Sequence, residues 1–129
     1  MKRMNIVLAL LIIFTATSFA GNSNTIDNKL QLATNGYIKA LKSDNLGVRN
    51  SALHQLTILK AKYPDYDLRK VVNHVKKISK KDSELLIRLN ADITYRYLTN
   101  REMSSKVNVD TIDPKIFFQD LYGQVANIE

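Results

Sequence analysis

The most concentrated charge in this sequence is basic and lies between residues 60 and 81. This segment holds eight Lys or Arg residues against two Asp residues, in a chain whose formal net charge is +7. Because helical residues step by about 100°, six of them share one arc opposite an apolar face. They are Arg69, Lys70, Lys76, Lys77, Lys80 and Lys81. This basic face could bind an acidic protein, a phosphorylated envelope glycan or lipid headgroups.

The alternative for the basic face is the solvated side of an ordinary amphipathic helix. No aromatic residue alternates with these lysines, so there is no platform on which nucleic-acid bases could stack. The sequence therefore argues against nucleic acid as the partner. It leaves open whether the basic face binds another anionic partner or is simply solvated.

Residues that could support metal or acid–base chemistry are few. His54 and His74 each lie ten residues from Pro64, one before it and one after it. A helical hairpin would therefore place them at similar positions along its axis. Asp65 and Asp67 would lie about 15 Å away along the helix axis, at about 1.5 Å per residue. His54 also points away from the apolar stripe of its own segment. We therefore expect two surface histidines, with no metal site and no cofactor.

The sequence also offers few residues that could act as a catalytic nucleophile or as a pair of acid–base carboxylates. The chain has no Cys and no Gly-x-Ser-x-Gly motif. The pairs Asp65 with Asp67 and Asp110 with Asp113 lie where helix caps are needed. A hydrolase would require a deep pocket around a perturbed acid or histidine. We expect a protein that is not an enzyme.

The elements that carry these residues are predicted to be helices, which makes the fold class all-α. Apolar residues recur at helical spacing in four segments. The four stripes are Ile26, Leu30, Ala33, Tyr37 and Leu41; Val48, Ala52, Leu56, Leu59 and Tyr63; Leu68, Val71, Val72, Val75 and Ile78; and Ile87, Ala91, Tyr95 and Leu98.

Polar and proline residues mark the breaks between the predicted helices. The breaks fall at residues 43–45, at Pro64 and at residues 79–82, where Asp or Asn side chains can cap a helix. Residues 100–111 read as a loop. Asp113 and Pro114 begin a last helix, 113–126, with Ile116, Phe117 and Leu121 on its apolar side. Tyr95 is expected in the core, and Tyr97 with its hydroxyl in water.

An internal repeat relates the second and fourth segments. At an offset of 39 residues, Val48 aligns with Ile87, Arg49 with Arg88 and Ala52 with Ala91. A period near 40 built from paired helices is typical of a helical solenoid. The stretch ALKSDNLGVRNSALHQLTIL, residues 40–59, resembles a HEAT repeat, and residues 82–91 are a weaker second copy.

The resemblance implies a short right-handed HEAT-like stack of two hairpins, 26–63 and 65–100. In that family the repeat Asp and Arg are structural, which implies the pairs Asp44 with Arg49 and Asp82 with Arg88. Members of the family are mostly binding scaffolds, so the resemblance implies protein–protein interaction. Because two repeats leave an open end, we expect the C-terminal helix, or alternatively a second copy of the chain, to cover it.

The start of the chain resembles a secretory signal peptide. Lys2 and Arg3 precede an apolar run, residues 6–14, and Ser18 and Ala20 place small residues at a cleavage site. The run is about half of the roughly 20 residues that a membrane-spanning helix needs, which favours cleavage over an uncleaved anchor. The expectation is an exported bacterial protein, periplasmic or secreted, with one domain over residues 21–129 and an unknown protein of the cell envelope as partner.

Overall fold

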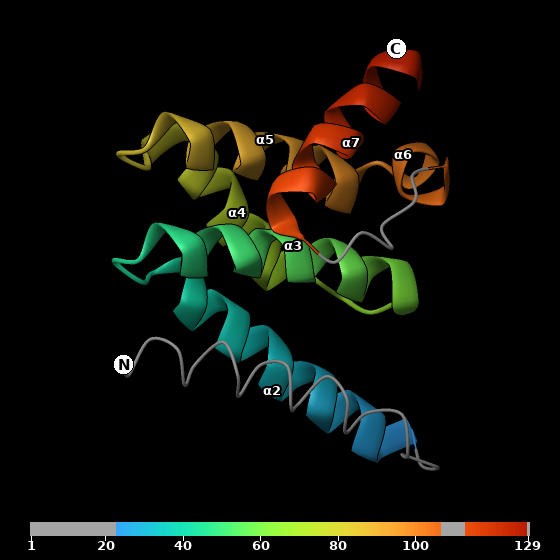
Figure 1. The fold of residues 1–129 in the computed structure, drawn as a ribbon. Coiled ribbons are helices and arrows are strands. Elements are labelled where there is room, and N and C mark those ends of the chain that lie inside the picture. The colour runs from blue at the N-terminus through green and yellow to red at the C-terminus, as the bar shows by residue number, and fades with distance from the viewer. Residues whose placement is uncertain (1–22, 107–112, 129) are drawn as a thin grey trace.

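The computed structural model describes residues 23–106 and 113–128, and this part of the chain is built of helices without strands (Figure 1). The predicted all-α class is confirmed. The helices are α2 (Ser23–Leu41), α3 (Leu46–Lys62), α4 (Arg69–Lys81), α5 (Leu85–Thr99), α6 (Arg101–Lys106) and α7 (Pro114–Ile128). None of the described helices is both long and apolar enough to cross a membrane. The predicted signal peptide and its cleavage site after Ala20 lie outside the described residues.

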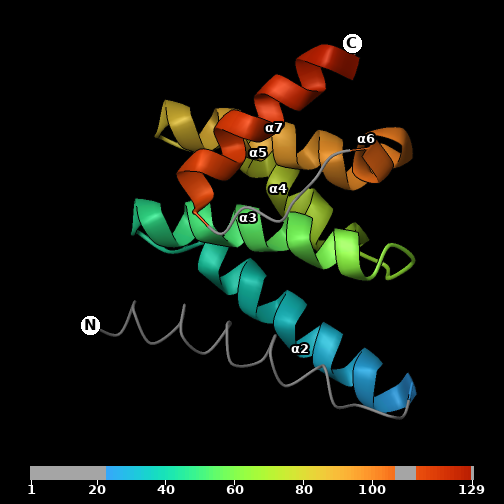
Figure 2. The ribbon, with the colours of Figure 1, turned by 45° about the vertical axis from the view of Figure 1, so that its right-hand side comes forward.

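Helices α2, α3, α4 and α5 pair in chain order. α2 contacts α3 and α4 contacts α5, while α2 also contacts α4 and α3 contacts α5. The two pairs therefore lie side by side, with equivalent helices adjacent (Figures 1 and 2). α3 and α5 are the central elements, because each of them also contacts α6 and α7.

Short polar side chains satisfy the backbone at several helix starts. The Asn45 carboxamide accepts a hydrogen bond from the Val48 N–H (3.1 Å) at the start of α3. Asp67 accepts from the Arg69 N–H (3.0 Å), and Asp113 accepts from the Lys115 N–H (2.8 Å). The predicted start of the last helix at residues 113 and 114 is thereby confirmed.

The predicted loop at residues 100–111 is wrong over residues 101–106. Arg101–Lys106 form α6, whose Met103 is buried and whose first turn is closed by a hydrogen bond from the Met103 N–H to the Asn100 carboxamide (3.1 Å). One buried residue in six gives too short a pattern for periodicity to detect. Residues 107–112 lie outside the described part of the chain.

The C-terminal helix occupies a different place from the one predicted. α7 lies against α3 and α5, and so covers the second helix of each pair, whereas the prediction placed it over the open end of two stacked hairpins (Figure 2). Phe117, Phe118 and Leu121 are buried there, whereas Ile116 is 49% exposed instead of facing the core.

The roles expected for the two tyrosines of α5 are reversed. Tyr97 is fully buried, and its hydroxyl donates to the Ser104 carbonyl of α6 (3.4 Å). Tyr95 is only partly buried, with the Lys76 ammonium 5.7 Å from its ring centre. The reason is that α5 contacts α4 on one side and α3, α6 and α7 on others, so a single stripe does not define its core face.

Candidate functional site

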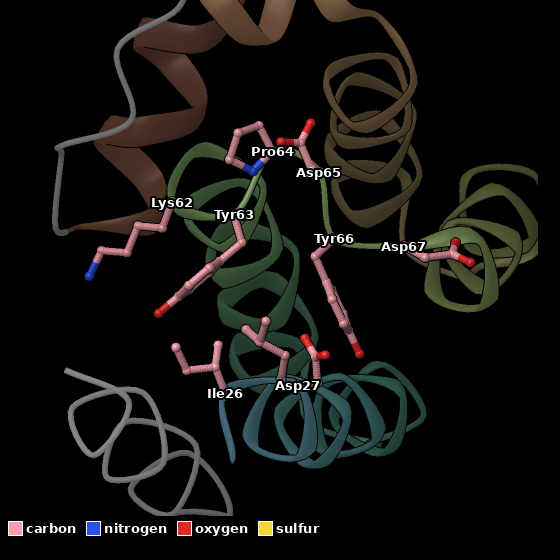
Figure 3. A pocket seen from close by; sticks show the side chains of 9 residues that line it. Ile26, Asp27, Lys62, Tyr63, Pro64, Asp65, Tyr66 and Asp67 are labelled. Atoms are coloured by element: carbon pink, nitrogen blue, oxygen red, sulfur yellow. The ribbon is translucent and has the colours of Figure 1, made fainter. Parts of the chain in front are cut away.

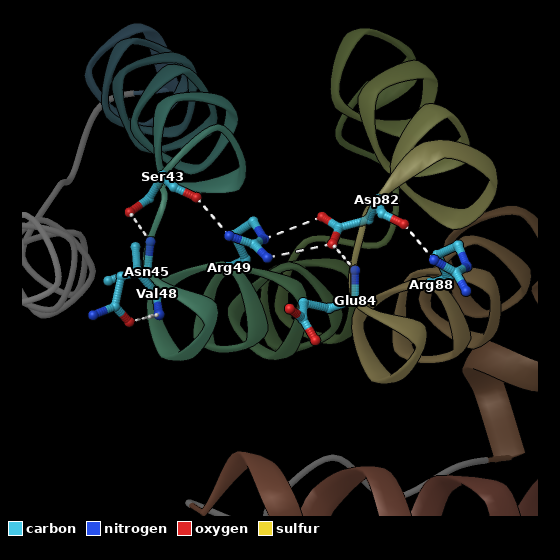
Figure 4. Close-up of polar contacts among 7 residues, drawn as sticks. All are labelled: Ser43, Asn45, Val48, Arg49, Asp82, Glu84 and Arg88. Carbon is cyan, nitrogen blue, oxygen red and sulfur yellow. Dashed lines mark hydrogen bonds and ion pairs between the residues drawn. The ribbon is translucent and has the colours of Figure 1, made fainter.

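A polar bridge joins the two inter-helix turns (Figure 4). The Arg49 guanidinium lies 3.1 Å from Asp82 Oδ2, donates to Asp82 Oδ1 (3.3 Å), and also donates to the Ser43 carbonyl (2.9 Å). The two side chains are only 11% and 9% exposed. The bridge connects the α2–α3 turn to the α4–α5 turn, and so fixes the position of one helix pair relative to the other.

This bridge is a contact that the predicted structural pairs did not include. Arg49 forms an ion pair with Asp82 of the following turn, and the predicted pair of Asp44 with Arg49 stays a prediction. The predicted contact between Asp82 and Arg88 is present, but Arg88 donates to the Asp82 main-chain carbonyl rather than to the carboxylate. The carboxylate instead accepts from Arg49 and from the Glu84 N–H (3.0 Å). Sequence spacing indicated which residues matter, but not which turn each side chain reaches.

The predicted basic face lies exposed along α4. All six residues, Arg69, Lys70, Lys76, Lys77, Lys80 and Lys81, have exposed side chains. The Arg69 side chain donates to Asp67 through three pairs of atoms, and this hydrogen bonding lowers the pKa of the Asp67 carboxyl to about 2. Lys70 donates to the Asn35 side chain of α2 (3.4 Å). The four remaining lysines extend along α4 to its C-terminal end.

The basic face continues to Lys42, in the turn directly after α2, which the sequence did not indicate. A groove of about 280 Å³ between α2 and α4 is lined by Lys42, His74, Lys77 and Lys81, together with Leu41, Ile78 and Asp82. Burial lowers the pKa of His74, and the charges of Lys42, Lys77 and Lys70 lower it further. The imidazole thus lies at a place of converging positive charge.

The prediction that both histidines are surface residues is wrong for His54. His54 is 1% exposed, and its ring lies 4.3 Å from the ring of Phe117 on α7. The stripe of α3 indicated one buried face, but α7 covers a second one. Within residues 23–106 and 113–128, no three His, Asp or Glu side chains lie together in a way that could hold a metal ion.

A second groove lies where α7 crosses α3 and α5. We call it the α3–α5–α7 groove; it measures about 460 Å³ and is lined by Asn50, Leu86, Asn90, Lys115, Phe118, Gln119 and Tyr122. The Asn90 side chain donates to Asn50 Oδ1 (2.8 Å). Asn90 is 2% exposed, and its own Oδ1 has no hydrogen-bond partner in the described part of the chain.

Sequence reasoning missed this groove because its walls come from three distant segments. The one available signal was the separation of Asn50 from Asn90, which is close to the repeat period and so places two amides on neighbouring helices. Asn90 is buried and Asn50 partly buried, which a pattern of apolar residues does not indicate.

Comparison of the chain with protein-family models, with curated proteins and with solved structures gives no match. Function must therefore be inferred from the chemistry of these grooves.

Proposed function

We propose that this chain is a non-catalytic helical module that holds a segment of another protein in the α3–α5–α7 groove, within the cell envelope after export. We further propose that α2, α3, α4 and α5 form a HEAT-like stack. Three features support the stack: α2 lies beside α4, α3 lies beside α5, and Arg49 bridges the two turns.

The observation that carries the proposal is the buried acceptor Asn90 Oδ1 in the lining of a groove that also presents Leu86, Phe118 and Tyr122. An amide oxygen without a hydrogen-bond partner costs about 1–3 kcal/mol when it is buried. A peptide segment lying in the groove could supply a backbone N–H to Asn90 Oδ1 once the side chains that cover this oxygen shift. Phe118, Leu86 and Tyr122 would receive apolar side chains of the same segment.

The surroundings of the groove also suit a protein partner. Leu86 is 54% exposed, and Leu85 and Leu89 beside it on α5 are exposed as well. Exposed leucines gathered on one helix favour an interaction surface over random surface composition. Lys115 on the lining adds a positive charge that an acidic residue of the partner could pair with.

The test compares two exposed leucines. The full chain, Leu86→Glu and Leu32→Glu are used as baits in envelope extract, after circular dichroism shows equal helicity. Leu32 is as exposed as Leu86 but lies on α2, away from the groove lining. We expect one protein to be retained by the full chain and by Leu32→Glu, and lost with Leu86→Glu. A photo-reactive residue at Tyr122 should cross-link to the same protein. Equal retention by all three baits would refute the groove as the site.

A second candidate function is the binding of anionic glycan or lipid headgroups by the basic face. The convergence of Lys42, Lys70 and Lys77 on His74 favours it over simple solvation. Vesicles containing phosphatidylglycerol should retain the chain at low salt and release it at high salt. Lys42→Gln with Lys77→Gln should abolish retention, whereas Arg69→Gln with Lys80→Gln should reduce it less, because Arg69 is already paired. Equal losses would indicate non-specific attraction.

A further inference from the structure

The turn between α3 and α4 brings two tyrosines together. The Tyr66 N–H donates to the Tyr63 carbonyl (3.1 Å), which closes a four-residue turn with Pro64 and Asp65 at its centre. The first and last residues of such a turn have Cα atoms within about 7 Å of each other. The Lys60 ammonium further fixes the turn by donating to the Pro64 carbonyl (2.8 Å). Both rings are partly buried against the core.

The two tyrosines form the walls of a cavity of about 560 Å³, which is distinct from the α3–α5–α7 groove. Figure 3 shows the rings on either side of a gap, with their faces turned toward the space between them, and with Ile26 and Asp27 of α2 at its foot. Leu30 of α2 also lines the cavity and is buried. The carboxylate of Asp27 lies within the gap, on the side of Tyr66 (Figure 3).

The other charged residues of the lining contribute less to the gap. Asp67 is engaged by Arg69, and Figure 3 shows the Asp65 carboxylate and the Lys62 ammonium turned away from the space between the rings. One carboxylate and two aromatic faces therefore define the chemistry of this cavity.

We propose that the Tyr63–Tyr66 cavity binds an alkylated ammonium group. Aromatic faces attract cations through their quadrupoles, and tyrosine pairs are suited to quaternary ammonium groups, whose methyls lie against the rings without needing hydrogen bonds. The Asp27 carboxylate supplies the opposite charge. A primary ammonium group would lose more hydration than one carboxylate returns, and an anion would be repelled by Asp27.

The first experiment titrates the full chain with choline, and in parallel with the neutral alcohol in which a tert-butyl group replaces the trimethylammonium. Calorimetry gives the affinities, and saturation-transfer NMR from tyrosine ring protons reports contact with the ligand methyls. We expect choline to bind at least roughly five-fold more tightly than the neutral alcohol. Equal binding of the two ligands, or no saturation transfer to choline, would overturn the proposal.

Three variants test separately how the aromatic ring, the tyrosine hydroxyl and the carboxylate charge contribute to choline binding. Tyr66→Ala should weaken choline binding roughly five- to thirty-fold, and Tyr66→Phe should retain most of it because the ring face is kept. Asp27→Asn should weaken it while leaving binding of the neutral alcohol unchanged. Since Tyr66→Ala could also loosen the fold, Asp27→Asn at an exposed position keeps the test decisive. An equal loss in Tyr66→Phe and Tyr66→Ala would contradict the assignment to the ring.

The source of the ammonium group is resolved by a second ligand. A peptide carrying trimethyl-lysine is titrated beside choline. Tighter binding of the peptide would identify the ligand as a modified side chain, and tighter binding of choline would identify a small free cation; both support the site. Binding of the unmethylated lysine peptide as tightly as the trimethylated one would refute the preference for alkylated ammonium.

Discussion

Replacing Asp82 by Asn should show how much the bridge between the two turns contributes to stability. Asn keeps the acceptor oxygen that the Glu84 N–H uses, but removes the charge that Arg49 faces at 3.1 Å. The Arg49 guanidinium would remain only 11% exposed, with the Ser43 carbonyl as its other acceptor. The substitution therefore measures the effect on stability of removing one charge of a nearly buried ion pair.

The magnitude follows from this burial. Breaking a fully buried ion pair from one side costs about 3–5 kcal/mol. The remaining exposure and the retained hydrogen bonds reduce this value, and we expect the free energy of unfolding to fall by about 2–3 kcal/mol. For a domain of this size, the thermal midpoint should then fall by roughly 10–20 °C.

The matched control is Asp67→Asn. Asp67 also faces an arginine and also accepts from a backbone N–H two residues later, but these two side chains are 57% and 89% exposed. Its midpoint should stay near that of the unchanged chain, because exposed pairs contribute little. Urea unfolding followed by circular dichroism measures both variants. Similar losses in the two would refute burial as the reason that the bridge stabilises the fold.

Three further predictions concern α7 and the shifted pKa values. Phe117→Ala should lower the free energy of unfolding by about 3–5 kcal/mol, measured by urea titration, because the ring is 1% exposed. NMR should place the pKa of His74 below 6.5, and Lys77→Gln should raise it. Because folding depresses this pKa, the contribution of His74 to stability is present above pH 6.5 and is lost as pH falls through the folded value. The Asp67 carboxyl should titrate at about 2, and Arg69→Gln should return it toward 3.8; its contribution is present above pH 3.8 and disappears as pH falls through about 2.

Periodicity predicted best the helices that have a single buried face. On α2 the stripe Leu30, Ala33, Tyr37 and Leu41 is buried as expected. α3 and α5 lie at the centre, so residues on their other faces are buried too, among them Leu53, Thr57 and Ile93. A helical periodicity that defines one apolar face cannot describe a helix that has neighbours on several sides. His54 and Tyr97 were misplaced for the same reason.

The grooves could be predicted only in part, because they are tertiary features. The basic face was visible, since its residues are close in sequence and share one helix. Lys42 joins it only because α2 lies beside α4. Tyr63 and Tyr66 flank Pro64 in the sequence, but a turn residue gives no indication that Asp27, from the first turns of α2, completes the cavity.

α7 links the stability of the fold to the proposed binding of a partner. Phe117 is absent from the lining of the α3–α5–α7 groove, but its ring meets that of Phe118, which is part of the lining, at 5.1 Å. A segment that contacts Phe118 and Tyr122 must stabilise the docked position of α7, since a ligand favours the state that binds it. Phe117→Ala should therefore weaken partner binding without altering any groove side chain, and added partner should restore part of the lost stability. Unchanged affinity in this variant would show that the groove does not depend on the anchoring of α7.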